Sequence, residues 1–305
     1  MRRVRALAAL AILSPVIAGL LASAPSAVAA RAPITVVATT TQLQDFARNV
    51  GGSRVRVVGL IRPNVDPHEY EPTPGDVTAV GTAKVVVKNG LGLDDWLDRV
   101  IAAGGGHPRI VVASRGVPVA RGADDERDGD PHIWFDPRNA AVMVSDIAAG
   151  LAAADPAGAA VYRANATRYR ARIRALDRSL AAKIATVPAV RRKLVTNHDA
   201  FGYFARRYGI RVVGAVIPSV STGAEPSARD LAKLVDTIRR EGVRVIFAES
   251  SVDPKLERAI ADEAGARVGP GLFADSLGPA GGPGATYLTA MTFDMDQMVK
   301  AFRAG

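Results

Sequence analysis

From residue 34 onward, the hydrophobic positions of this chain follow two alternating periods. Short runs rich in β-branched residues, typical of buried strands, alternate with segments whose apolar residues recur every three or four positions, typical of amphipathic helices. Strands are predicted at 34–38, 54–61, 84–88, 109–113, 193–196, 211–217, 243–248 and 266–268. Helices are predicted at 41–50, 74–81, 94–103, 137–152, 199–208, 227–241, 253–264 and 285–302. This alternation indicates mostly parallel sheets with helices on both faces.

One segment in the middle of the chain interrupts the alternation. Asp155 and Pro156 form a favourable helix start, with Asp155 as the N-cap, and no further proline occurs before Pro188. Between them, apolar residues form one stripe, and the opposite face carries several arginines and a lysine. The stripe consists of Ala159, Tyr162, Ala166, Tyr169, Ile173, Leu176, Leu180 and Ile184. We predict a single rigid helix of about 31 residues, roughly 46 Å long. A two-chain coiled coil is the alternative, although alanines and tyrosines suit its seam less well.

These patterns together predict an α/β protein of two lobes joined by one long rigid linker helix. The N-terminal lobe is assigned to residues 30–154, the linker helix to 155–187 and the C-terminal lobe to 188–305. Ligands of open α/β sheets bind beyond the carboxyl ends of the strands, so functional side chains are expected in the loops there.

Residues 1–29 have the pattern of a secretory signal peptide. Arginines near the start precede an apolar run at 6–21, and small residues at 27–29 suit cleavage. A membrane anchor is the alternative, but Pro15 and Pro25 interrupt a stretch that is short for a span. We therefore expect a soluble exported protein, located in the periplasm or outside the cell.

Cysteine is absent from the chain, and this changes what chemistry is expected. Disulfides, a lipid anchor on an N-terminal cysteine and thiolate metal ligands are all excluded by that composition. The net charge is +9, but aromatic residues make up only 5% and do not alternate with the basic ones. Nucleic-acid binding is therefore not expected, and the charge is interpreted as a solvated surface.

Three of the four histidines lie in short polar motifs that follow predicted strands or loops. The motifs are Asp-Pro-His-Glu-Tyr at 66–70, Asp-Pro-His-Ile-Trp at 130–134 and Thr-Asn-His-Asp at 196–199. A fourth loop, 273–278, adds a carboxylate. The candidate ligands are His68, His132, His198 and Asp275. Three imidazoles and one carboxylate suffice for a four-coordinate nitrogen and oxygen site around a divalent metal.

Nearby acidic residues are weaker candidates for supporting the ligands. Asp66 and Asp130 each precede a proline that stiffens the turn, and each is placed to orient the histidine that follows. Glu69 is a candidate for a similar role or for a ligand after rearrangement. Glu249, at the end of the strand 243–248, either lines the cleft or caps the next helix. His107, between a glycine and a proline, is interpreted as a surface residue.

The segments 66–74, 130–134, 197–201 and 275–278 resemble, in order, the signatures of one known family. It comprises the zinc- and manganese-binding solute receptors of bacterial ABC importers. The resemblance implies two α/β lobes with the metal in the cleft between them. It places His68 and His132 on the N-terminal lobe, and His198 and Asp275 on the C-terminal lobe. It also implies a monomer that delivers its metal to an importer permease in the cytoplasmic membrane.

A histidine at position 198 makes the chain more similar to the zinc-preferring members, and imidazole suits zinc better than manganese. Manganese remains the alternative metal. Many zinc members carry a histidine-rich acidic loop before the second ligand, whereas residues 121–129 here contain no histidine. That loop is interpreted as a solvated segment, with weak cation collection as the alternative.

Two other functions are considered. A zinc-dependent hydrolase needs an open coordination position and a base, which Glu69 or Glu249 would supply, but a fourth ligand at Asp275 closes the site. A receptor for an organic ligand of the siderophore type needs a larger pocket lined by aromatic residues or arginines. Capture of a bare metal ion is therefore preferred, and no enzymatic activity is expected.

The sequence also yields two mechanistic expectations. Loops of the C-terminal lobe are expected to bring in His198 and Asp275 when metal binds. Metal affinity is expected to fall as pH drops through about 6.5, because only neutral imidazole coordinates.

Overall fold

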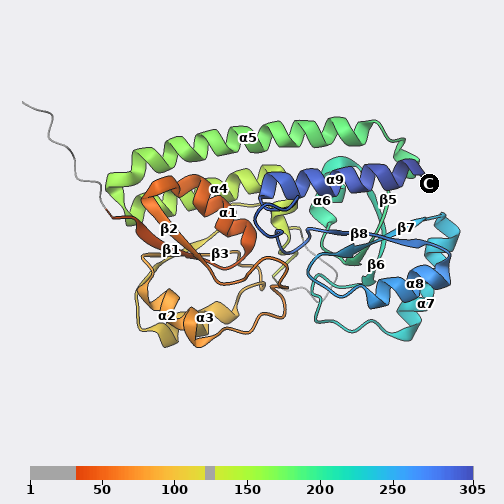
Figure 1. The fold of residues 1–305 in the computed structure, drawn as a ribbon, viewed down its shortest axis with the longest axis horizontal. Helices are drawn as coiled ribbons and strands as arrows, with labels where there is room; N and C mark the ends of the chain where they lie inside the picture. Colours follow the sequence, from red (N-terminus) through yellow and green to blue (C-terminus); the bar gives the residue numbers. More distant parts are fainter. Residues whose placement is uncertain (1–31, 121–127, 305) are drawn as a thin grey trace, which may run out of the picture. The chain divides into compact units, whose positions relative to one another are not determined.

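The computed structural model describes residues 32–120 and 128–304, all within one structural unit. The predicted leader at 1–29 and most of the acidic loop at 121–129 lie outside the described residues. No helix in the described ranges has the length and apolar character that a bilayer span requires. The two-lobe α/β prediction is confirmed (Figure 1).

The N-terminal lobe contains a four-stranded parallel sheet in the order β2-β1-β3-β4. Its strands are β1 (Ile34–Ala38), β2 (Val55–Gly59), β3 (Val85–Lys88) and β4 (Arg109–Val112). Its helices are α1 (Thr41–Gly51), α2 (Pro74–Thr82), α3 (Trp96–Gly104) and α4 (Pro137–Ala154). Val36, Val85 and Val87 pack toward α1 and α4, while Val37 and Val86 pack toward α2 and α3. Burial on both faces explains why the central strands β1 and β3 are nearly continuous apolar runs.

The C-terminal lobe contains two parallel strand pairs, β5–β6 and β7–β8, with β5 beside β7. The strands are β5 (Lys193–His198), β6 (Arg211–Ile217), β7 (Val245–Glu249) and β8 (Arg267–Leu272). The helices are α6 (Gly202–Tyr208), α7 (Ala228–Glu241), α8 (Lys255–Ala264) and α9 (Tyr287–Ala304). Each pair contains a register shift, between Leu194 and Val195 and between Phe247 and Glu249. The single sheet expected in this lobe is therefore found as two separate two-stranded ladders.

The long helix α5 (Ala159–Ala185) spans 27 residues and starts later than predicted. A one-turn 3-10 helix, Pro156–Gly158, precedes it. The Asp155 carboxylate accepts hydrogen bonds from Arg54 at 2.8 Å and from the Tyr162 hydroxyl at 2.8 Å, and these contacts hold the tighter turn. The predicted stripe is buried from Tyr162 to Ile184, whereas Ala159 is only half-buried.

Helix α5 is not an isolated connection between two bodies. It packs along α4 and α1 and then along α9 (Figure 1). One hydrophobic core extends from the N-terminal sheet through α5 to α6 and α9. At its centre the Asp45 carboxylate on α1 accepts the Tyr169 hydroxyl of α5 at 2.6 Å and the Tyr287 amide of α9 at 3.3 Å. The lobe boundaries assigned from sequence stay a prediction, and the core crosses them.

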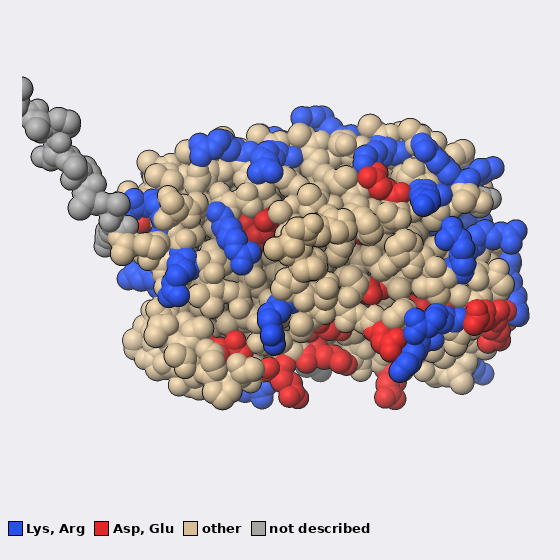
Figure 2. Space-filling view, viewed as in Figure 1, with Lys and Arg blue, Asp and Glu red and all other residues tan. Residues whose placement is uncertain are grey.

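Basic side chains are spread over the surface rather than concentrated in one place. Figure 2 shows lysines and arginines distributed along the α5 side and both ends of the viewed face, separated by uncharged surface. This distribution fits the interpretation of the net charge as a solvated surface.

Candidate metal centre

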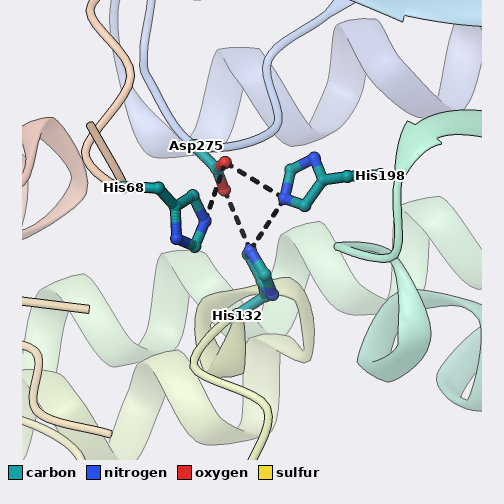
Figure 3. Close-up of side chains that lie close together, drawn as sticks. All are labelled: His68, His132, His198 and Asp275. Carbon is teal, nitrogen blue, oxygen red and sulfur yellow. Dashed lines mark hydrogen bonds and ion pairs between the residues drawn. The ribbon is translucent and has the colours of Figure 1, made fainter. Parts of the chain in front are cut away.

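Four side chains from distant parts of the chain converge at one point (Figure 3). One nitrogen or oxygen of each lies within 4.8 Å of the corresponding atom of the others. Asp275 is central: its carboxylate lies 3.3 Å from Nε2 of His68 and 3.2 Å from Nε2 of both His132 and His198. The Nε2 atoms of His132 and His198 are 3.2 Å apart.

Each residue is delivered by a strand end or by the loop beyond it. His68 lies in the loop after β2, and His132 immediately precedes the 3-10 turn Ile133–Phe135 that leads into α4. His198 is the last residue of β5, two residues beyond the predicted strand end, and Asp275 follows β8. The site therefore lies at the carboxyl edges of the sheets, where parallel sheets commonly bind ligands.

Carboxylates fix the orientation of two of the imidazole rings. Oδ1 of Asp130 lies 2.8 Å from Nδ1 of His132 and also accepts the His132 amide at 3.0 Å. Oε1 of Glu249, the last residue of β7, lies 2.5 Å from Nδ1 of His198. When each ring is neutral, a proton on Nδ1 donates to the carboxylate, so Nε2 presents a lone pair to the centre.

The converging atoms are thus acceptors that face one another. Within the described residues, Nε2 of His68 and both oxygens of Asp275 are buried without a hydrogen-bond donor. Such an arrangement is costly unless a cation or protons occupy its centre. In a tetrahedral zinc site with bonds of about 2.05 Å, neighbouring donors are about 3.3 Å apart. The distances of 3.2–3.3 Å from the two Asp275 oxygens to the three Nε2 atoms are of that size, and the four donor atoms as a set lie within 4.8 Å of one another.

The pKa values of these groups reflect the same crowding. Burial by itself would lower the pKa of His132, but the charge of Asp275 and hydrogen bonds to Asp275 and Asp130 raise it to about 9. Burial likewise opposes protonation of His198, yet Glu249 and Asp275 raise its pKa well above the usual value. Burial would raise the pKa of Asp275, but His198 and His132 hold it well below its usual range. Without metal, the site therefore retains protons on its rings.

The loop that carries Asp275 is attached to the N-terminal lobe. The Ala274 carbonyl accepts hydrogen bonds from the Gln42 amide at 3.4 Å and from Nε1 of Trp134 at 3.3 Å. The Leu277 amide donates to Oγ1 of Thr41 at 2.8 Å. Asp275 follows a strand of the C-terminal lobe, and its loop is held both by these contacts and by Asp294 of α9, whose carboxylate accepts the Phe273 amide at 3.0 Å. The expectation that loops of the C-terminal lobe bring in His198 and Asp275 when metal binds stays a prediction.

The remaining acidic candidates occupy different places. Oδ1 of Asp66 accepts the backbone amide of His68 at 2.9 Å, and Oδ2 accepts the Thr222 hydroxyl at 2.7 Å. Glu69 is exposed beside Gly223 and lies outside the four-residue cluster. His107 is exposed and lies outside the cluster as well.

Several supporting residues were not identified from the sequence. Asn89 Nδ2 donates to the Pro131 carbonyl at 3.1 Å, which holds the loop before His132. The backbone amide of Asn89 in turn donates to the Asp94 carboxylate at 2.6 Å. Their only local signal is a polar residue directly after a buried strand. Thr222 carries no signal, because its partner is 156 positions away.

Comparison with known proteins places this geometry in a family. The family model described as "ZnuA: Zinc-uptake complex component A periplasmic" matches residues 36–301. The chain belongs to the ZnuA family. The solved structure of the periplasmic zinc-binding protein TroA from Treponema pallidum superposes with a TM-score of 0.82 at 33% identity, covering 88% of this chain and 99% of that one.

Proteins of similar sequence are named for different metals. The zinc-binding protein TroA of Treponema pallidum is 35% identical over 87% of this chain and 88% of its own length. The manganese-binding lipoprotein MntA of Bacillus subtilis is 32% identical over 88% of this chain and 90% of its own length. The iron-binding protein YfeA of Yersinia pestis is 31% identical over 88% of this chain and 86% of its own length. Family membership therefore leaves the choice of metal open.

Proposed function

We propose that this protein captures a single divalent cation outside the cytoplasm and delivers it to an ABC-type importer. The supporting observation is the convergence of three imidazole nitrogens and one carboxylate, in which Nε2 of His68 and both oxygens of Asp275 have no hydrogen-bond donor among the described residues. Membership of the ZnuA family supports the role in uptake. The proposed ligands are His68, His132, His198 and Asp275.

Zinc is the proposed cargo, with manganese as the alternative. Three imidazole nitrogens, each 3.2–3.3 Å from an oxygen of Asp275, suit zinc, whereas manganese prefers more oxygen ligands. An organic ligand is disfavoured because the four side chains already lie within 4.8 Å of one another. Hydrolysis is disfavoured because Asp275 faces all three rings and occupies the position that a reactive water would need.

The setting of this activity rests on the sequence and the family. The predicted signal peptide at 1–29 supports export, and delivery to a membrane permease as a monomer follows from the family resemblance. MntA is named a lipoprotein, so the predicted absence of a lipid anchor is not part of this proposal.

Titration calorimetry on chelator-treated protein tests the proposal. Wild-type protein should bind one zinc ion, and manganese should compete only weakly. His132→Ala removes a buried ligand and should weaken zinc binding more than about 100-fold, since loss of a ligand's supporting partner alone costs 10–100-fold. His107→Ala is the matched control and should bind as wild type does. Equal losses in the two variants, or no binding by wild type, would refute the proposed site.

A further inference from the structure

The His68 side of the four-residue site, called its mouth below, is the side nearest to solvent. Its side chain is 6% exposed, while those of His132, His198 and Asp275 are fully buried. Phe135 of the N-terminal lobe and Phe201 of the C-terminal lobe are in ring contact, with centroids 4.4 Å apart and ring planes inclined by 37°. The ion is therefore expected to enter and leave past the loop that carries His68.

A direct hydrogen bond crosses this mouth. Thr222, in the loop between β6 and α7, donates its hydroxyl to Oδ2 of Asp66 at 2.7 Å. Oδ1 of the same carboxylate accepts the backbone amide of His68 at 2.9 Å. Both Thr222 and Asp66 are half-buried, as expected for residues at the rim of a cleft. One carboxylate thus joins a residue of the C-terminal lobe to the segment that holds an N-terminal ligand.

The Thr222 loop is in turn connected to the segment that carries His198. The Asp199 amide donates to the Ser219 carbonyl at 3.0 Å. Ser219 Oγ accepts the Ser221 amide at 3.1 Å, and Ser221 Oγ accepts the Gly223 amide at 3.3 Å. These bonds stiffen the loop around Thr222. Movement of His198 away from the site therefore pulls on Thr222.

The other three proposed ligands are attached to the N-terminal lobe. Asp275 is included, because its loop is hydrogen-bonded to Thr41, Gln42 and Trp134. Opening of the site would then separate His198 from the other three ligands. The Thr222–Asp66 hydrogen bond joins the two groups that move apart.

We propose that Thr222 is a positioning residue that closes the mouth of the metal site through Asp66 and slows release of the bound ion. This inference rests on the proposed function, because it assumes that the four-residue centre holds metal. Thr222 does not touch the ion, so its loss changes the dissociation rate and leaves the ligand set intact.

The test uses full-length protein loaded with one equivalent of zinc and mixed rapidly with excess chromogenic chelator. Thr222→Val keeps the shape of the side chain but removes the donor, and zinc should dissociate about tenfold faster, equivalent to about 1.4 kcal/mol. Thr222→Ser retains the hydroxyl and should release zinc within about twofold of the wild-type rate. Thr237→Val is the matched control, because both hydrogen bonds of that hydroxyl lie within α7. It donates to the Lys233 carbonyl and accepts a hydrogen bond from the Arg240 guanidinium.

The possible outcomes separate this inference from the proposed function. An unchanged rate in Thr222→Val would overturn the inference while leaving zinc binding intact. Equally fast release from Thr222→Ser, or from Thr237→Val, would overturn it too, because the hydroxyl at 222 would then not be responsible. Failure of the wild-type protein to retain zinc would instead end the proposed function.

Discussion

The same tripeptide, Asp-Pro-His, is used in two ways in this protein. In both copies the aspartate accepts the backbone amide of the histidine two positions later. In the second copy Asp130 also reaches the ring of His132, whereas in the first copy Asp66 reaches Thr222 across the cleft. The local turn follows from proline and the short acidic side chain. In the first copy the partner of the second carboxylate oxygen lies 156 positions away, so the local sequence does not predict it.

Glu249 should strengthen metal binding through the ring of His198. Glu249→Gln preserves an acceptor for Nδ1 but removes the negative charge, which lowers the basicity of Nε2. We expect zinc affinity to fall 10–100-fold, measured by competition with a chelator of known affinity. Glu241→Gln is the control, because Glu241 pairs with Arg211 and Lys193 away from the site. Equal affinities of Glu249→Gln and wild type would show that the contact has no role in binding.

The pH dependence of zinc binding should be shifted upward from the value expected for free imidazole. In the metal-free protein the pKa of His132 is raised to about 9, so this ring is protonated at neutral pH and must lose its proton to bind zinc. Affinity should therefore be highest above pH 9 and fall steadily below it, rather than begin to fall near 6.5. Calorimetry at pH 7.5 in buffers of different ionisation enthalpy should show release of about one proton or more per zinc. Binding without proton release would contradict the raised pKa.

Among the elements, α5 is the one whose sequence pattern was most informative. Its stripe at spacings of three and four is buried from Tyr162 to Ile184, because those positions share one face of a 3.6-residue helix. Its start differed by one turn because Asp155 is engaged by Arg54 and Tyr162. Strand ends were less predictable: β5 continues to His198, since pairing with Ile217 on β6 extends the ladder beyond the apolar run.

Substitutions along α5 should separate packing from helix propensity. Leu180 is fully buried in the core shared by the lobes, so Leu180→Ala should lower the free energy of unfolding by about 2–5 kcal/mol. Val161 on the same helix is 42% exposed, and Val161→Ala should change the free energy of unfolding by no more than about 0.5 kcal/mol. Urea unfolding followed by circular dichroism measures both. A similar small effect of the two substitutions would mean that the helix contributes little to the core.

At the scale of the whole molecule, the two lobes share one hydrophobic core and one polar centre. The core passes through α5 and α9, and the Asp275 loop is attached to the opposite lobe from its preceding strand. Wide opening of the lobes would expose this core, so capture of the ion is expected to involve motion near the mouth of the cleft.

Metal binding should stabilise the entire described unit rather than one lobe. A ligand that binds only the folded state at 100 times its Kd adds about 2.7 kcal/mol to the free energy of unfolding. Scanning calorimetry should therefore show one transition that moves to higher temperature with zinc. In His132→Ala the same zinc concentration should leave the transition in place. Two separate transitions, with only one moved by zinc, would show that the lobes unfold independently.

The sequence by itself determined the elements, their parallel arrangement and the identity of the candidate ligands. Periodicity reports which face of each segment is buried, and rare histidines in stiff turns at strand ends stand out against an otherwise ordinary composition. Only the tertiary structure decided how far apart those ligands lie, that Glu249 reaches the ring of His198, and that the Asp275 loop is held by Thr41, Gln42 and Trp134. These contacts join residues 51 to 236 positions apart, and no local pattern encodes such pairings.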